Sequence, residues 1–226
     1  MIRMKDTTAR TTRRTDALSK DRIIAAAIRI LDREGERGLT FRALAADLAT
    51  GAGAIYWHVA NKNELLAEAT NAVITPLLDN LPPHHDARED LRAIALGLFD
   101  AAHAHPWLGS QVLHASWQLS VMLLFEAIGS KLTQLGVPRE ARFNVASALV
   151  GYIAGKLGQE TANMRNSPAG MTRETFLAMA ADQWKALDPE EFPFVHEIAD
   201  QLRDHDDREQ FLAGLDLMLT GIAHMA

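Results

Sequence analysis

The stretch AIYWHVANKNELL, residues 54–66, places three large side chains side by side, Tyr56, Trp57 and His58, and Tyr56, His58 and the later Lys62 are of types that can bind phosphate groups. Adjacent residues of a helix point in different directions, so three large side chains in a row cannot all share one buried face. Ile55 and Val59 are four residues apart and predict the inward face, which lets Tyr56 and His58 project toward phosphates. Lys62 adds a cation beside the N-terminus of the next helix, which itself attracts anions. The alternative is that Tyr56 and Trp57 are core aromatics of a small helical bundle.

The sequence lacks the common motifs of enzymes, nucleotide-binding sites and metal sites. The chain has no Cys, which excludes a disulfide framework, a thiolate metal site and a cysteine nucleophile. It has no GxSxG, HExxH, phosphate-loop or dinucleotide fingerprint. His103 and His105 are two residues apart and diverge by about 200° on a helix, which is unsuitable for a shared metal ion. We expect no metal and no cofactor, and an enzyme built on Asp100 and His103 is the weakest alternative.

Two short helices joined by a glycine-bearing turn are predicted to position the phosphate-gripping residues. Hydrophobic periodicity predicts a supporting helix from Lys20 to just before Gly35. Thr40 is a good N-cap for the next helix, and the glycines of the stretch 49–53 permit a tight turn before a helix over about 52–59. This order predicts a helix-turn-helix, whose second short helix can enter a DNA major groove.

Charge is distributed unevenly along the chain. The net charge is −6, yet residues 1–66 carry +4 and residues 67–226 carry −10. A basic head on an acidic body suggests that the head meets a polyanion. Residues 1–19 lack apolar periodicity and predict a flexible basic arm, in which Arg13 and Arg14 could enter a minor groove. The alternative for this arm is a solvated tail.

The chain from residue 67 onward is predicted to be helical throughout. Asn61 caps a long helix in which Pro76 is expected to produce a kink or an end. Further helices, separated by Pro- and Gly-bearing breaks, are expected at 87–104, 107–113, 117–135, 139–164, 173–186, 192–203 and 207–224. The fold class is therefore all-α, with a three-helix DNA-binding domain at 20–66 and a helical bundle for ligand binding and dimerisation at 67–226.

A stripe of small residues at helical spacing predicts a close helix–helix contact in the second domain. Its members are Ala148, Gly151, Gly155, Gly158 and Ala162. The apolar residues expected to meet them from the last helix are Phe211, Leu215, Met218 and Ile222. Together they predict a four-helix dimer interface, with packing inside one chain as the alternative.

Large apolar and amphipathic side chains in the same domain are candidates for the wall of a ligand pocket: Phe99, His103, Trp107, His114, Trp117, Phe125, Met164 and Trp184. Each taken alone is more typical of a core residue. As a group, the His and Trp residues between 103 and 117 favour a pocket with aromatic walls and a few polar contacts.

The stretch GLTFRALAADLATGAGAIYWHVANKNELL, residues 38–66, resembles the DNA-binding signature of TetR-family transcriptional regulators. The resemblance covers about Ile23 to Ala69, and a weaker one covers 194–222. It implies a homodimer with a three-helix DNA-binding head and a helical ligand-binding body. By position, Arg42 corresponds to a guanine-reading Arg of the family, while the residues at positions that pack on or bond to the DNA backbone are Tyr56, Trp57, His58 and Lys62.

This chain departs from the tetracycline-repressor type where base readers are expected. Ala52, Gly53 and Ala54 occupy those positions and offer no side-chain hydrogen bond to a base. Thr50 is the polar side chain nearby, and Thr40 is the remaining candidate contact at the start of the preceding helix. Specificity is therefore expected to depend on Arg42, on DNA shape and on the basic arm.

These features favour a cytoplasmic DNA-binding transcriptional regulator without a membrane segment. The expected partners are double-stranded operator DNA, a small apolar or aromatic effector and a second copy of the chain. The expected mode is a dimeric repressor that the effector releases from its operator. The alternative is a helical ligand-binding or scaffolding dimer with little operator binding, which the small residues at 52–54 keep open.

Overall fold

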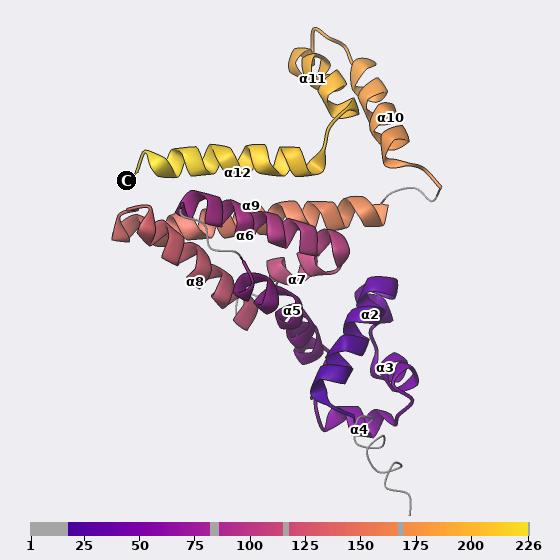
Figure 1. Cartoon of the computed structure of the whole chain (residues 1–226). Helices are drawn as coiled ribbons and strands as arrows, with labels where there is room; N and C mark the ends of the chain where they lie inside the picture. Colours follow the sequence, from indigo (N-terminus) through magenta and orange to yellow (C-terminus); the bar gives the residue numbers. More distant parts are fainter. Residues whose placement is uncertain (1–17, 82–85, 115–117, 167–169, 226) are drawn as a thin grey trace, which may run out of the picture. The chain divides into compact units, whose positions relative to one another are not determined.

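The computed structural model describes residues 18–81, 86–114, 118–166 and 170–225, except for the side chains at 113–114 and 164–166. In these ranges the regular elements are all helices (Figure 1): α2 (Lys20–Gly38), α3 (Phe41–Asp47), α4 (Ala52–Tyr56), α5 (Lys62–Asp79), α6 (Ala87–Ala104), α7 (Leu108–His114), α8 (Leu119–Gln134), α9 (Arg139–Asn166), α10 (Arg173–Lys185), α11 (Pro193–Arg203) and α12 (Asp207–Ala223). The predicted all-α class is confirmed. The chain divides into two compact units, one up to Val73 and one from Ile74, and α5 contributes to both.

The N-terminal unit is built around the buried face of α2. Ile23 and Ile30 of this helix are fully buried, together with Leu44 of α3 and Ile55 of α4. The helix was expected to end before Gly35, and Gly35 does leave helical geometry with φ +66°. Glycine adopts this left-handed conformation at no steric cost. Helical turns continue beyond Gly35 as far as Gly38.

Helix α5 begins with a reciprocal cap. The Asn61 side chain accepts a hydrogen bond from the Glu64 amide at 2.9 Å, and the Glu64 carboxylate accepts one from the Ala60 amide at 2.8 Å. Such caps satisfy amides that have no partner inside a helix. The helix then runs through Pro76 to Asp79, so of the kink or end expected at this proline, the end does not occur.

The C-terminal unit is a bundle around α9, its longest helix. Helices α6, α7, α8 and α12 all pack on α9, while α10 and α11 pack chiefly on each other and project from the bundle as a hairpin (Figure 1). The buried side of α9 carries Leu149, Ile153 and Leu157. No helix of the described part has the length and apolar character needed to cross a bilayer.

Candidate nucleic-acid interface and ligand cavity

Helices α3 and α4 are fixed to each other by a cap and an aromatic stack. The Thr40 hydroxyl accepts a hydrogen bond from the Ala43 amide at 3.0 Å, which caps α3 as expected. The ring of Tyr56, at the end of α4, stacks on that of Phe41 with centroids 4.2 Å apart and planes within 7°. Phe41 was not among the expected site residues, since an aromatic residue at a helix start has no distinctive sequence signal. The stack gives Tyr56 a packing role as well as an outward position.

The turn between α3 and α4 does not use its glycines as expected. Gly51 has φ −82°, which any residue can adopt. The left-handed residue is Ala49, with φ 50°, a conformation that is unfavourable for a side chain with a Cβ. The Thr50 amide closes the turn by donating to the Ala45 carbonyl at 2.9 Å. Gly53 is exposed, and beyond its chain neighbours and its own helix backbone a Cβ there would meet no described atom within 4 Å.

The aromatic residues of the stretch 54–66 are not core residues. Trp57 is 90% exposed and Tyr56 is 54% exposed, whereas Ile55 and Val59 beside them are buried. Arg42 at the start of α3 is also exposed. The inward pair Ile55 and Val59 is therefore confirmed, and the core interpretation of Trp57 is wrong. A Trp held this far out of the protein is available to a partner.

Lys62 contacts the protein itself in this structure. Its ammonium group donates a hydrogen bond to the Glu36 carbonyl near the end of α2. Lys20, at the start of the same helix, pairs with Glu68 of α5 at 2.7 Å, and this hydrogen bond raises the pKa of Lys20. The two lysines thus tie α5 to both ends of α2. A phosphate contact by Lys62 remains a prediction, as does one by half-buried His58.

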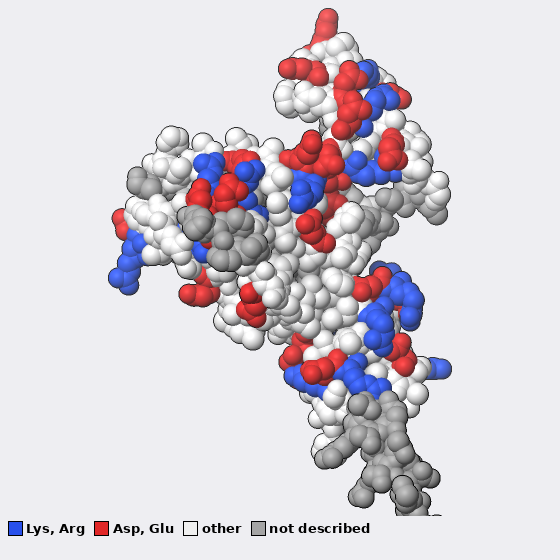
Figure 2. Space-filling view, in the orientation of Figure 1, with Lys and Arg blue, Asp and Glu red and all other residues white. Residues whose placement is uncertain are grey.

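Basic and acidic side chains lie close together on the face of the N-terminal unit that Figure 2 shows. Part of this pattern is paired, as in Arg29 of α2 with Asp47 of α3 at 2.6 Å. Arg13 and Arg14, expected to enter a minor groove, lie outside the described residues.

A cavity of about 480 Å³ lies within the C-terminal unit at the end of α6. Its lining combines one aromatic ring with charged groups from four segments: Phe99, Asp100, His103, Ala104, Glu160, Arg173, Asp206, Asp207 and Arg208. Arg173 pairs with Asp207 at 2.6 Å, and Arg208 lies 3.5 Å from Asp100. Burial, and then the charge of Asp207, raise the pKa of Glu160. The site is thus more charged than the expected aromatic pocket, and sequence periodicity gave no signal for Glu160 or Arg173.

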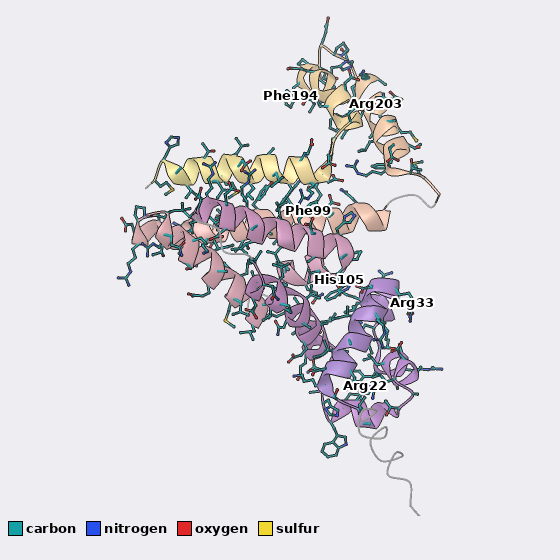
Figure 3. The ribbon with its side chains drawn as sticks, viewed as in Figure 1. Arg22, Arg33, Phe99, His105, Phe194 and Arg203 are labelled. Carbon is teal, nitrogen blue, oxygen red and sulfur yellow. The ribbon has the colours of Figure 1, made fainter. Side chains whose placement is uncertain are left out.

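A second cavity, of about 510 Å³, lies between the α10–α11 hairpin and α12. Trp184, Phe194 and Ile198 supply much of its apolar lining, and His205 and Gln210 contribute polar groups. Figure 3 shows Phe194 on the hairpin. The described residues contain no cluster of His, Asp and Glu suited to hold a metal ion.

The residues expected to line one pocket are dispersed. Phe99 and His103 line the first cavity and Trp184 lines the second. Trp107 is 1% exposed and belongs to the core, and Phe125 is half-buried on α8. Trp117 lies outside the described residues, as do the side chains of His114 and Met164.

The two halves of the expected dimer interface differ in exposure. Ala148, Gly151, Gly155 and Ala162 of α9 are exposed, and Gly158 is half-buried. On α12 the expected contacts Phe211, Leu215 and Ile222 are instead buried within their own chain, and Met218 is half-buried. They face α6 and α9, as shown by the stack of Phe211 on Phe99 at 5.0 Å. The outward face of α12 carries Leu217, which is 77% exposed, and Gly221.

Comparison with known proteins agrees with this architecture. The family described as "Bacterial regulatory proteins, tetR family" matches residues 23–69, and "Tetracyclin repressor-like, C-terminal domain" matches residues 81–226. The solved structure of the transcriptional regulator SCO7222, a TetR from Streptomyces coelicolor, is 46% identical with a TM-score of 0.82, covering 92% of this chain and 99% of that one.

Two curated relatives are more distant. The transcriptional repressor DrrR1 of Streptomyces coeruleorubidus is 29% identical over 214 residues, which are 91% of this chain and 77% of the relative. An HTH-type transcriptional regulator of Saccharopolyspora erythraea is 28% identical over 156 residues, 68% of this chain. That match spans 65%, slightly less than two thirds, of the relative's own length.

Proposed function

The chain belongs to the TetR family of bacterial transcriptional regulators, and we propose that it is a dimeric repressor that a small ligand releases from operator DNA. The observation that carries the proposal is the exposure of Trp57 and Arg42 on a helix-turn-helix whose inward residues are buried. An exposed Arg is ordinary, but a Trp that is 90% exposed contributes little to the packing of its own chain. Against DNA, the ring would pack on the sugar-phosphate backbone and the Arg would reach a guanine edge.

The recognition helix would approach DNA closely without reading many bases. Ala52, Gly53 and Ala54 have no side-chain donors or acceptors, and a Cβ on Gly53 would face open space beyond its own helix backbone and chain neighbours. Small side chains allow the helix backbone close to the groove and suit contact with a thymine methyl group. Hydrogen-bonding readout then depends chiefly on Arg42, with Thr40 and Thr50 as further candidates.

Dimerisation is proposed through the exposed faces of α9 and α12. These helices lie side by side, since the Tyr152 hydroxyl donates to the Phe211 carbonyl at 2.7 Å and Lys156 bonds Gln210 at 2.6 Å. Gly151 and Gly155 on one helix and Leu217 on the other would form a continuous apolar surface. Two copies of this pair would make a four-helix interface, in which the glycines allow close approach.

Release of DNA would require the ligand to favour one arrangement of the C-terminal unit. Helix α5 is part of both units, so a change at its end in the bundle can be transmitted to the DNA-binding unit. A differential binding free energy of about 1.4 kcal/mol between the two states suffices for a tenfold loss of operator affinity.

The proposal is tested by a gel shift of the purified chain on the DNA upstream of its own gene, at increasing salt. Specific binding should weaken steeply with salt because phosphate contacts release counterions. Arg42→Ala should lose about 1–3 kcal/mol of operator binding and relax specificity at one base pair. Arg139→Ala, at an exposed position of α9, is the matched control and should bind as the parent does.

A second candidate function, a helical ligand-binding dimer with little operator binding, is favoured by the lack of polar groups at 52–54. The same experiment separates the two. If binding at low salt is absent, or is equal for Arg42→Ala and for the parent on every sequence, the repressor proposal is wrong.

A further inference from the structure

We propose that the cavity at the end of α6 takes a ligand in which a protonated amine is attached to an aromatic or apolar ring, with Glu160 as the partner of the amine. That this ligand is the effector depends on the proposed function, whereas its binding in the cavity does not. It narrows the effector class from apolar molecules in general to amphipathic cations.

The ring would be received by an aromatic wall that is already rigid. Phe99 of α6 is almost fully buried and stacks on Phe211 at 5.0 Å, and Phe211 stacks in turn on Tyr152 at 5.6 Å. Figure 3 shows Phe99 between α6 and α12. The small part of this ring that faces the cavity offers apolar contact without further loss of side-chain entropy.

The arginines of the cavity are already paired, which disfavours an anionic ligand. Arg173 bonds Asp207 at 2.6 Å and also donates to the His205 carbonyl at 3.0 Å. Arg208 lies 3.5 Å from Asp100. An anion would have to compete with these carboxylates for each guanidinium. Figure 2 shows acidic and basic side chains together near the start of α12.

Glu160 is the one carboxylate of the lining without a partner among the described residues, whereas the structure gives one to each of the other three. It is half-buried, and the described residues act on it through their charges, not through a hydrogen bond or ion pair. Asp206, by contrast, caps α12 by accepting the Glu209 amide at 2.8 Å. The lining thus carries four carboxylates against two arginines, and the surplus negative charge lies beside an apolar wall. Burial and the nearby charge of Asp207 raise the pKa of Glu160, although His103, Arg173 and Lys156 act in the opposite direction.

A cation at this position would relieve that unfavourable charge. It would form a charge-assisted hydrogen bond with Glu160, and such bonds are about twice as strong as neutral ones. The cavity volume of about 480 Å³ is in the usual range for small organic ligands.

The test uses three probes with the same ring and different charges: 2-naphthylmethylamine, 2-naphthylmethanol and 2-naphthoic acid. Binding to the full-length chain is measured by isothermal titration calorimetry at pH 7. The amine should bind at least about tenfold more tightly than the alcohol, as expected for a hydrogen bond to a charged group, and the acid should bind most weakly. Glu160→Gln should remove the preference for the amine, and Phe99→Ala should weaken all three probes.

Two further variants make the result decisive. Glu160→Asp keeps the charge and should keep the amine preference, while Glu126→Gln, at an exposed position of α8, should leave all affinities unchanged. The inference is overturned if the amine does not bind, if the acid binds best, or if Glu160→Gln keeps the preference. Operator binding measured on the ligand-free chain tests the proposed function independently, so failure of one leaves the other standing.

Discussion

Trp57 and Trp107 are the same residue type at opposite extremes of exposure. Trp57 is 90% exposed at the end of α4, and Trp107 is 1% exposed before α7. A buried Trp contributes to stability through its contact area, whereas a Trp in solvent contributes little. Exposure therefore distinguishes Trp107, which stabilises the fold, from Trp57, which is available to a partner.

We predict that Trp57→Ala changes the free energy of unfolding by no more than about 0.5 kcal/mol, while Trp107→Ala costs about 3–5 kcal/mol. Urea denaturation followed by circular dichroism measures both. In a gel shift, Trp57→Ala should weaken operator binding even though the protein is fully folded. Equal destabilisation by the two substitutions would show that Trp57 packs on the protein after all.

Individual side chains were predicted unevenly from the sequence. The burial of Ile55 and Val59 followed from their spacing, and the cap by Asn61 followed from its residue type. The stack of Tyr56 on Phe41 could not be predicted, because it joins two helices whose angle depends on the turn between them. The charges around Glu160 were missed for a similar reason: they come from separate segments that only the tertiary fold brings together.

At the scale of elements, helix positions were predicted closely and helix faces less well. Capping residues and Pro or Gly breaks mark helix ends directly in the sequence, as Asp86 and Thr172 do for α6 and α10. Helix α12 is apolar on more than one side, with Phe211 inward and Leu217 outward. Periodicity alone cannot decide which apolar side faces its own chain, and the side expected to meet a second copy is the one that packs within this chain.

The contact between α7 and α9 depends on one glycine. A Cβ on Gly109 would lie 2.4 Å from the Leu157 carbonyl oxygen and 2.7 Å from the Thr161 hydroxyl. That hydroxyl is itself engaged, donating to the Pro106 carbonyl at 2.7 Å. The helices can cross this closely only because position 109 has no side chain.

Gly109→Ala should therefore force the two helices apart and cost about 1–3 kcal/mol of stability, measured by urea denaturation. Gly129→Ala is the matched control, because Gly129 lies inside α8 and a Cβ there would meet nothing within 4 Å beyond its chain neighbours and its own helix backbone. It should be neutral or stabilise by up to about 1 kcal/mol, as Ala does in a helix. Equal effects at the two positions would contradict the close crossing.

At the scale of the whole molecule, the proposed assembly unites a basic head with an acidic body. The net charge is +4 over residues 1–66 and −10 over residues 67–226. A uniformly basic chain would attract DNA at every surface, whereas this distribution favours contact through the head. Two heads in a dimer would double the phosphate contacts, which makes dimerisation part of operator affinity.

The last prediction tests the dimer surface on α12. Leu217→Glu places a charge at an exposed position, so the fold of one chain should be unaffected. In a symmetric dimer the residue is buried twice. Losing two buried Leu side chains costs about 3–6 kcal/mol, which would raise the dissociation constant of the dimer at least about 100-fold.

Light scattering after size-exclusion chromatography should show Leu217→Glu as a monomer at micromolar concentration, with an unchanged circular dichroism spectrum. Operator binding should fall in parallel, because a single head loses the second half-site. Met122→Glu is the matched control, since Met122 of α8 is 53% exposed and lies outside the proposed surface. A Leu217→Glu protein that stays dimeric would place the interface elsewhere, while a Met122→Glu protein that dissociates would point to α8.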